Sequence, residues 1–119
     1  MNILRNRVNL IGRLGSDPKV SVLEGGRKRA RFTLATNDVY RNGRGEKIVD
    51  TQWHNLVAWG NNAAFAEKYL SKGMEVTVEG RLTYRDYEDR EGVKRTLAEV
   101  VVDRLLILRG KVQRPAVEA

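Results

Sequence analysis

The sequence has no cysteine, two prolines and a single histidine among its 119 residues. Without cysteine the chain can form neither a disulfide nor a thiolate zinc site, and a reducing, cytoplasmic compartment is expected. No apolar run reaches the ~18 residues of a membrane span, and segment 1–7 lacks the apolar core of a signal peptide. We therefore expect a soluble chain that is not exported and makes no membrane contact.

The residue patterns of common catalytic sites are missing as well. His54 has no second histidine and no nearby carboxylate cluster at ligand spacing, which disfavours a metal site or imidazole catalysis. Glu88, Asp89 and Glu91 surround Gly92 in a predicted turn and are expected to face solvent. The sequence has no nucleophile elbow and no phosphate-binding glycine loop with a lysine. We predict a protein that is not an enzyme and needs no metal or cofactor.

Charge of one sign is in excess. Lysine and arginine total 22 against 15 for aspartate and glutamate, which gives a formal net charge of +7 and a sequence pI near 10.1. Such a surface attracts polyanions at long range. Nucleic acid is the commonest partner of this kind, although the charge alone also suits an anionic membrane or simple solubility.

Alternation of apolar and polar residues indicates β-strands along most of the chain. In segment 27–36, Ala30, Phe32 and Leu34 form an apolar side, while Arg29 and Arg31 lie on the other. The expected strands span residues 8–14, 19–23, 27–36, 48–59, 74–87 and 93–108. A glycine-punctuated stretch, residues 40–45, is predicted to be an exposed hairpin loop.

One segment, residues 61–73, predicts a helix. It has an asparagine at the N-cap position, an apolar stripe that includes Phe65 and Tyr69, and Gly73 as the stop. The length of the chain fits one domain, and strands followed by one short helix and a hairpin favour a small barrel over a parallel sheet. We therefore predict an all-β fold, the OB-fold: a five-stranded Greek-key barrel with one short α-helix between strands three and four. It should cover residues 1–110, with a short flexible tail at 111–119.

Four aromatic side chains stand among polar or basic residues: Tyr40, Trp53, Trp59 and Tyr87. Exposed rings among cations suit nucleobases, because every base has a flat π-face on which a ring can stack. The alternative for Trp53 is a contact between subunits, and for Trp59 it is a cap on the barrel end.

Basic residues on strand sides can line a groove that follows the phosphates of a nucleic acid. Arg29 and Arg31 are the strongest candidates because the opposite side of their strand is core. A merely solvated strand face is the alternative. Further candidates are Arg13, Arg81, Arg85, Lys94 and Arg95.

Several motifs now stand in a fixed order: NRVNLIGRLG at 6–15, FTLAT at 32–36, TQWH at 51–54, EKYLSKG at 67–73, VEGRL at 78–82 and EVVV at 99–102. Together they resemble the DNA-binding domain of the bacterial single-stranded DNA-binding protein family, over about residues 3–108. The resemblance implies an OB-fold, a homotetramer, and sequence-independent coating of single-stranded DNA on the nucleoid during replication, recombination and repair. It also implies base stacking by the four aromatic residues above, and it places His54 in a subunit contact.

Members of that family usually end in a linker and an acidic tip that recruits other replication proteins, whereas this sequence ends in PAVEA. Recruitment by an acidic tail is therefore not expected from this sequence, which is either part of a longer chain or a member that coats DNA without it. Two other functions stay open: an RNA-binding OB-fold protein, and a scaffolding module of a primosome or recombination complex.

Overall fold

Six strands and one α-helix are found in the computed structural model, which describes residues 5–110. In chain order the elements are β1 (Val8–Leu14), β2 (Lys19–Val22), η1 (Glu24–Gly26), β3 (Lys28–Arg41), β4 (Lys47–Trp59), α1 (Gly60–Tyr69), β5 (Glu75–Glu88) and β6 (Lys94–Arg109). The predicted tail, residues 111–119, lies outside the described residues.

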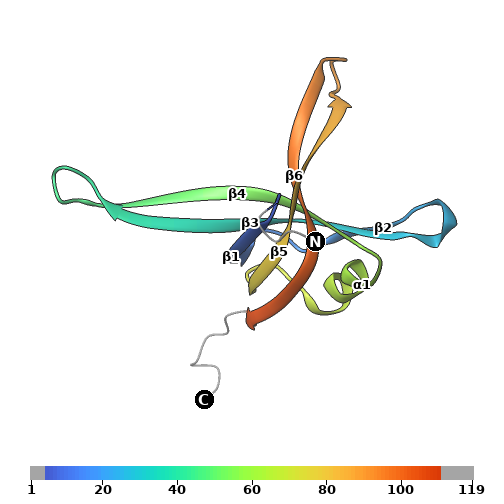
Figure 1. Ribbon diagram of the computed structural model, residues 1–119, viewed down its shortest axis with the longest axis horizontal. Coiled ribbons are helices and arrows are strands. Elements are labelled where there is room, and N and C mark those ends of the chain that lie inside the picture. The colour runs from blue at the N-terminus through green and yellow to red at the C-terminus, as the bar shows by residue number, and fades with distance from the viewer. Residues whose placement is uncertain (1–4, 111–119) are drawn as a thin grey trace.

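Strand pairing closes the sheet into a barrel (Figure 1). The spatial order is β1-β5-β6-β4-β3-β2, and a further pairing of β1 with β3 joins Leu14 to Leu34. Every pair is antiparallel except β4 with β6, which meet at Leu56 and Val100. β2 borders β3 outside the ring. Five strands thus form the barrel, α1 lies between the third and fourth of them, and the predicted OB-fold is confirmed.

Alternation along the strands supplies the core. Phe32 and Leu34 from β3 face Leu56 from β4 and Val76 from β5, and each of these side chains is buried. α1 covers the cluster with Ala63 and Ala66, along with Leu70 just after the helix. Because the inward residues are apolar and close-packed, the outward residues of the same strands are fixed in position without contributing to the core.

The β3–β4 and β5–β6 hairpins extend beyond the barrel as projecting arms (Figure 1). The β3–β4 arm consists of residues 36–52 and the β5–β6 arm of residues 84–98. The prediction of a loop at residues 40–45 was wrong for its first two positions, because Tyr40 pairs with Ile48 and Arg41 with Lys47 inside the ladder. These cross-strand pairs prolong the hairpin, and the turn is confined to 42–46.

The helix differs from its prediction at both ends. It begins at Gly60, with Trp59 in the N-cap position and no side-chain cap. It ends at Tyr69, before the predicted stop at Gly73. Asn62, in the predicted capping region, instead donates its amide to the carbonyls of Val102 and Asp103 at 3.2 and 3.3 Å, which ties the helix to β6. Tyr69, which belongs to the apolar stripe predicted for the helix, is 49% exposed, with its ring 4.9 Å from that of Phe65.

Barrel closure depends on a glycine where β1 meets β3. A Cβ added to Gly12 would overlap the carbonyl oxygen of Ala35 and lie 3.2 Å from Leu34 Cγ. We expect Gly12→Ala to lower the free energy of unfolding by about 1–3 kcal/mol, the usual cost of overpacking. Denaturant unfolding measures this, with Gly43→Ala as the control because its Cβ would meet open space. Equal stability of the two variants would show that β1 and β3 do not approach this closely.

Candidate nucleic-acid interface

The outer side of β3 and β4 carries both tryptophans. Arg29 pairs with Trp59 and Ala35 with Trp53 in an antiparallel register. Directly paired residues point to the same face of a sheet, and residues two apart along a strand do so as well. Trp53, Trp59, Arg29 and Arg31 therefore share one outer face, opposite the buried Phe32 and Leu34. We call this the β3–β4 face.

Trp53 lies on this face against Gly15, a residue without a side chain. Its ring is 62% exposed. A Cβ added to Gly15 would overlap Trp53 Cζ3 and lie 2.7 Å from Thr33 Oγ1, so the ring lies directly against the glycine. The Cζ3 and Cη2 atoms of the indole therefore lie against Gly15, and the large exposed fraction leaves room for a flat ligand on the ring.

Trp59 has a cationic neighbour that the sequence reasoning did not select. The guanidinium carbon of Arg27 lies 4.3 Å from the centroid of the Trp59 ring, within cation–π range. The two side chains border a depression of about 420 Å³ next to Gly60 and the start of α1. Arg27 has the same parity as Arg29 and Arg31, so alternation alone could have added it to the candidates.

The β5–β6 pair continues the surface. Register pairs Arg81 with Val101, Arg85 with Leu97 and Tyr87 with Arg95, which places these residues on one side of the pair. The Arg85 guanidinium carbon lies 5.7 Å from the Tyr87 ring centroid. Each of the three cations has an acidic partner: Arg81 Nη1 is 3.5 Å from Asp103 Oδ1, Arg95 Nε donates to Asp89 Oδ2 at 2.8 Å, and Arg85 pairs with Glu99.

A buried carboxylate joins the two halves of this surface. Glu99 on β6 is 6% exposed, and it lies 3.3 Å (Oε1) from Arg85 Nε and 3.8 Å (Oε2) from Arg31 Nη2. A groove of about 220 Å³ runs beside it, lined also by Lys19, Thr33 and Asn55 among others. Burial lowers the pKa of the Arg31 guanidinium, the charge of Arg85 lowers it further, and the charge of Glu99 opposes both. Sequence reasoning missed Glu99.

Two predicted site residues lie away from this surface, and a third is on it but already bonded. Arg13 pairs with Ala35, the partner of Trp53, and so shares the outer face, but its Nη1 donates to the Gly73 carbonyl at 2.9 Å, beside the turn that follows α1. Lys94 pairs with Glu88, so it lies on the opposite side of the β5–β6 arm from Tyr87. Tyr40 pairs with Ile48, which by register is the opposite side of the β3–β4 arm from Trp53.

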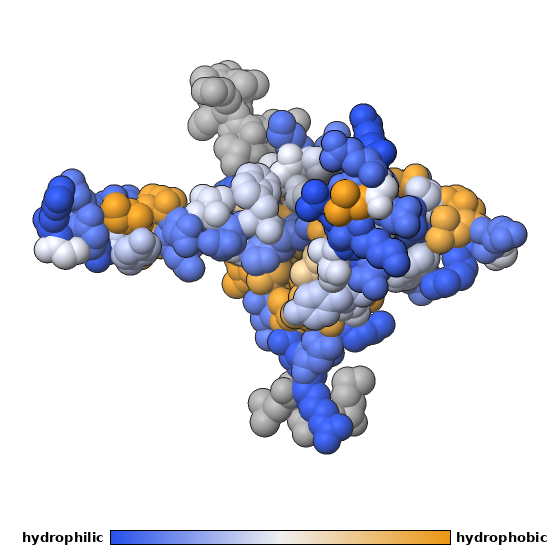
Figure 2. All heavy atoms as spheres, turned by 90° about the horizontal axis from the view of Figure 1, so that it is seen from above, coloured by the Kyte–Doolittle hydropathy of each residue, from blue (hydrophilic) through white to orange (hydrophobic). Residues whose placement is uncertain are grey.

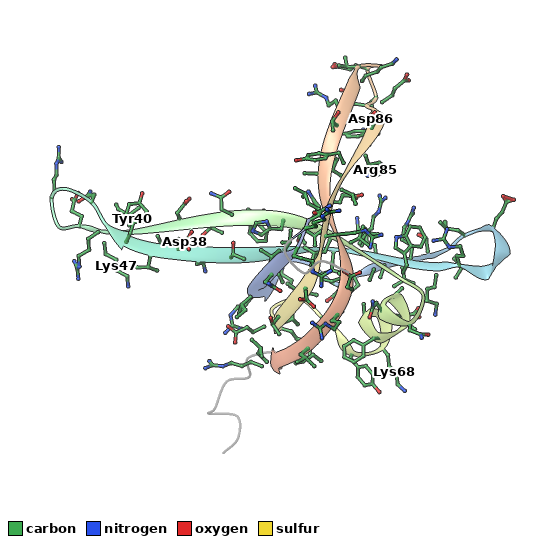
Figure 3. All side chains as sticks on the ribbon, viewed as in Figure 1. Asp38, Tyr40, Lys47, Lys68, Arg85 and Asp86 are labelled. Carbon is green, nitrogen blue, oxygen red and sulfur yellow. The ribbon has the colours of Figure 1, made fainter. Side chains whose placement is uncertain are left out.

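Figure 3 shows Tyr40 near the end of the β3–β4 arm, far from Arg85 at the base of the other arm. Hydrophobic side chains are also exposed along the β3–β4 arm (Figure 2), where Val39 and Val49 are 59% and 54% exposed. These two residues pair with each other on the Trp53 side of the arm. An apolar pair therefore lies farther out on the same side of the arm as Trp53, separated from it by the polar pair Asn37 and Thr51, whereas Tyr40 is on the opposite side.

His54 lies on the inward side of β4. It pairs with Leu34, and its Nε2 is 2.9 Å from Thr36 Oγ1. The imidazole is partly buried and has no carboxylate partner among its hydrogen bonds in the described part of the chain. Between residues 5 and 110, no three histidine, aspartate or glutamate side chains gather as a metal site would require. In the same range, α1 lacks the length and apolar character of a membrane-crossing helix.

Contact between Gly15 and the Trp53 ring gives a spectroscopic prediction. In a Trp59→Phe background, Gly15→Ala should push the Trp53 ring away from Thr33 into solvent and shift its fluorescence emission to longer wavelength. Gly43→Ala in the same background is the control. An unchanged spectrum and unchanged acrylamide quenching would show that the ring does not rest on Gly15.

Comparison with known proteins agrees with this geometry. Residues 5–108 match the model of the single-strand binding protein family. The chain is 36% identical over 106 residues to single-stranded DNA-binding proteins of Neisseria meningitidis serogroups A and B, covering 89% of this chain and 61% of theirs. It is 38% identical over 107 residues to single-stranded DNA-binding protein 1 of Chlorobaculum tepidum, covering 89% and 66%.

A solved structure supports the same relationship. A Plasmodium falciparum SSB in complex with single-stranded DNA has a TM-score of 0.80 and 34% identity, covering 91% of this chain and 99% of that one. The chain spans less than two thirds of the length of the curated relatives just described. The match of the family model, the relatives and the barrel agree, and the chain belongs to the single-strand binding protein family.

Proposed function

We propose that this chain binds and coats single-stranded DNA without sequence preference, as a binding protein with no catalytic step. The proposal rests on the β3–β4 face, where an exposed Trp53 and a partly exposed Trp59 lie among arginines. The opposite side of the same two strands faces the core of the barrel. We place its action in the cytoplasm, on the DNA strands that replication, recombination and repair leave unpaired.

Binding has an electrostatic component. The net charge of +7 draws the strand in, and the guanidinium groups of Arg29, Arg31 and Arg85 replace counterions on its phosphates. For single strands the logarithm of the binding constant falls with that of the salt concentration by about 0.7 per phosphate contacted. Arg81 and Lys94 contribute as more distant contacts, since both are exposed. Arg13, whose guanidinium is bound to Gly73, would need to give up that bond first.

Stacking supplies the second component. Each base on an aromatic ring adds roughly 1–3 kcal/mol, with little dependence on base identity. Trp53 and Trp59 are the principal platforms, and Tyr87 beside Arg85 is the third. Tyr40 contributes only if the strand passes around the edge of the β3–β4 arm. Stacking on these rings requires an unpaired base, so duplex DNA should bind poorly.

Trp53→Ala tests the stacking component. It should weaken oligo(dT) binding by about tenfold, because 1.4 kcal/mol of lost stacking is a factor of ten in the dissociation constant. Fluorescence anisotropy of a labelled oligo(dT) measures this at fixed salt concentration. Tyr69→Ala is the control, because that exposed ring packs on Phe65 of the helix. Unchanged affinity in Trp53→Ala would remove this ring from the binding surface.

The same titration separates the other candidate functions. An RNA-binding protein would bind poly(U) more tightly than poly(dT), and a scaffolding module would bind neither. The names of the Neisseria and Chlorobaculum relatives favour DNA.

We further propose that the chain assembles as a homotetramer. Support comes from an apolar stripe on the outer side of β1, β5 and β6, where Ile11 pairs with Thr77 and Thr77 with Leu106. Ile11 is 59% and Leu106 67% exposed, an arrangement that favours contact with a second copy. Arg7 and Arg104 border the stripe as ion pairs with Glu79. The role of His54 in a subunit contact belongs to this proposal.

Light scattering tests the assembly. The unaltered chain should give the mass of four copies, and Leu106→Lys should give a lower mass because it places a charge in an apolar contact. Val49→Lys, on the β3–β4 arm, is the control and should keep the larger mass. A monomeric mass for the unaltered chain would refute the proposal.

A further inference from the structure

We infer that Glu99 is a positioning residue of the DNA-binding surface: it holds the guanidinium groups of Arg31 and Arg85 beside each other where the two halves of the surface meet. The inference deepens the proposed function and rests on it. It assigns a favourable role in DNA binding to a residue whose own charge repels DNA.

The position of Glu99 is fixed by the barrel. The neighbouring Val100 pairs with Leu56 of β4 on one side, and Glu99 itself pairs with Thr83 of β5 on the other. Thr83 Oγ1 donates a hydrogen bond to the Glu99 carbonyl oxygen at 3.4 Å. Glu99 thus lies on the strand that joins the β3–β4 pair to the β5–β6 arm, and its carboxylate can reach an arginine from each.

Burial makes this carboxylate costly. Among residues 5–110, Glu99 alone is both buried and polar or charged, with 6% of its surface exposed. A buried charge is tolerated when it is paired and hydrogen-bonded. Placed among phosphate-binding residues, it also repels the phosphates of an approaching strand. These two costs must be offset by a favourable interaction with neighbouring residues. The charged neighbours of the carboxylate are the two arginines.

Those arginines need an anion between them. Burial and the charge of Arg85 both disfavour the charged form of Arg31, and the Glu99 carboxylate acts in the opposite direction. Without it, two like charges would face each other across a partly dehydrated groove and turn apart. With it, Arg31 stays in the groove lined by Thr33 and Leu97, and Arg85 stays beside the Glu99 carboxylate that borders the groove.

The carboxylate leaves donors free for phosphates. Arg85 uses Nε for its hydrogen bond to Glu99, so its two terminal nitrogens are not needed for that contact. Arg31 approaches Oε2 through Nη2 at 3.8 Å, a looser ion pair. Its Nε is buried and has no hydrogen-bond partner within the described residues, so the donors that can reach a phosphate are those at the end of the guanidinium. Glu99 therefore orients the arginines without consuming their hydrogen-bonding capacity.

Glu99→Gln separates positioning from repulsion, because the two roles predict effects of opposite sign. The substitution keeps the side-chain size and raises the net charge by one unit, so a merely repulsive carboxylate predicts tighter binding. Positioning predicts the reverse: about five-fold weaker binding of oligo(dT), with a smaller slope of affinity against salt as the arginine contacts are lost. Glu91→Gln, an exposed residue in the turn of the β5–β6 arm, makes the same charge change and should bind as tightly as the unaltered chain or slightly tighter.

Two further variants keep the test decisive if Glu99→Gln folds poorly. Glu99→Asp preserves the net charge but shortens the side chain by one methylene. If Glu99 positions the arginines, this variant should bind oligo(dT) more weakly; if Glu99 only repels phosphates, its affinity should not change. In an Arg85→Ala background, the effect of Glu99→Gln should shrink, because one of the two guanidinium groups it positions is gone. Thermal unfolding of each variant confirms that the titrations are made on folded protein.

A readout without DNA completes the experiment. Loss of the carboxylate should speed solvent exchange of the Arg85 Nε proton, seen by NMR, and Glu91→Gln should leave it unchanged. Tighter binding by Glu99→Gln, equal to that of Glu91→Gln, overturns the inference while the proposed function stands. Failure of the unaltered chain to bind oligo(dT) overturns the proposed function, and this inference with it.

Discussion

The antiparallel register of β3 on β4 is the constraint on which the rest of the structure depends. It runs unbroken from the Arg29–Trp59 pair to the Arg41–Lys47 pair. Because side chains alternate along each strand, this one register sends Phe32 and Leu34 into the core and leaves the two tryptophans outside. A shift by one residue would exchange the two sets, placing the tryptophans in the core and Phe32 and Leu34 in water. Core packing and the proposed DNA-binding surface therefore fix each other.

The electrostatics of the surface are less uniform than its net charge suggests. Arginines dominate the outer face, yet several are already paired with carboxylates, as Arg95 is with Asp89 and Arg81 with Asp103. Exposed pairs of this kind contribute little to stability and are weakened by salt, so a polyanion can compete for the arginines. Glu99 differs because it is buried and joins two arginines from different strands.

Much of the fold could be predicted from local sequence patterns. Alternation located the strands and the inward side of β3, because a buried face requires apolar residues at every second position. It could not show which strands lie side by side, and so it missed Glu99, whose partner Arg31 is far away in the sequence. The support of the Trp53 ring by Gly15 was missed for the same reason. Arg13 was selected for its charge alone, which says nothing of the Gly73 carbonyl that holds it.

The site differs from the prediction where hairpins leave the barrel. Tyr40 was assigned to a loop, in which a side chain could turn in any direction; inside the β3 ladder, its side is set by pairing with Ile48. The start of the helix was misplaced because Asn62 bonds to β6 instead of to its own helix, a contact between distant segments that outweighs local capping preference.

A crystal structure of the chain with an oligo(dT) strand tests the central claim most directly. We expect bases stacked on Trp53 and Trp59, and phosphates beside Arg31 and Arg85, with the strand crossing from the β3–β4 face to the β5–β6 arm. A strand bound instead along the Ile11–Leu106 stripe or over α1, with both tryptophans uncovered, would contradict it.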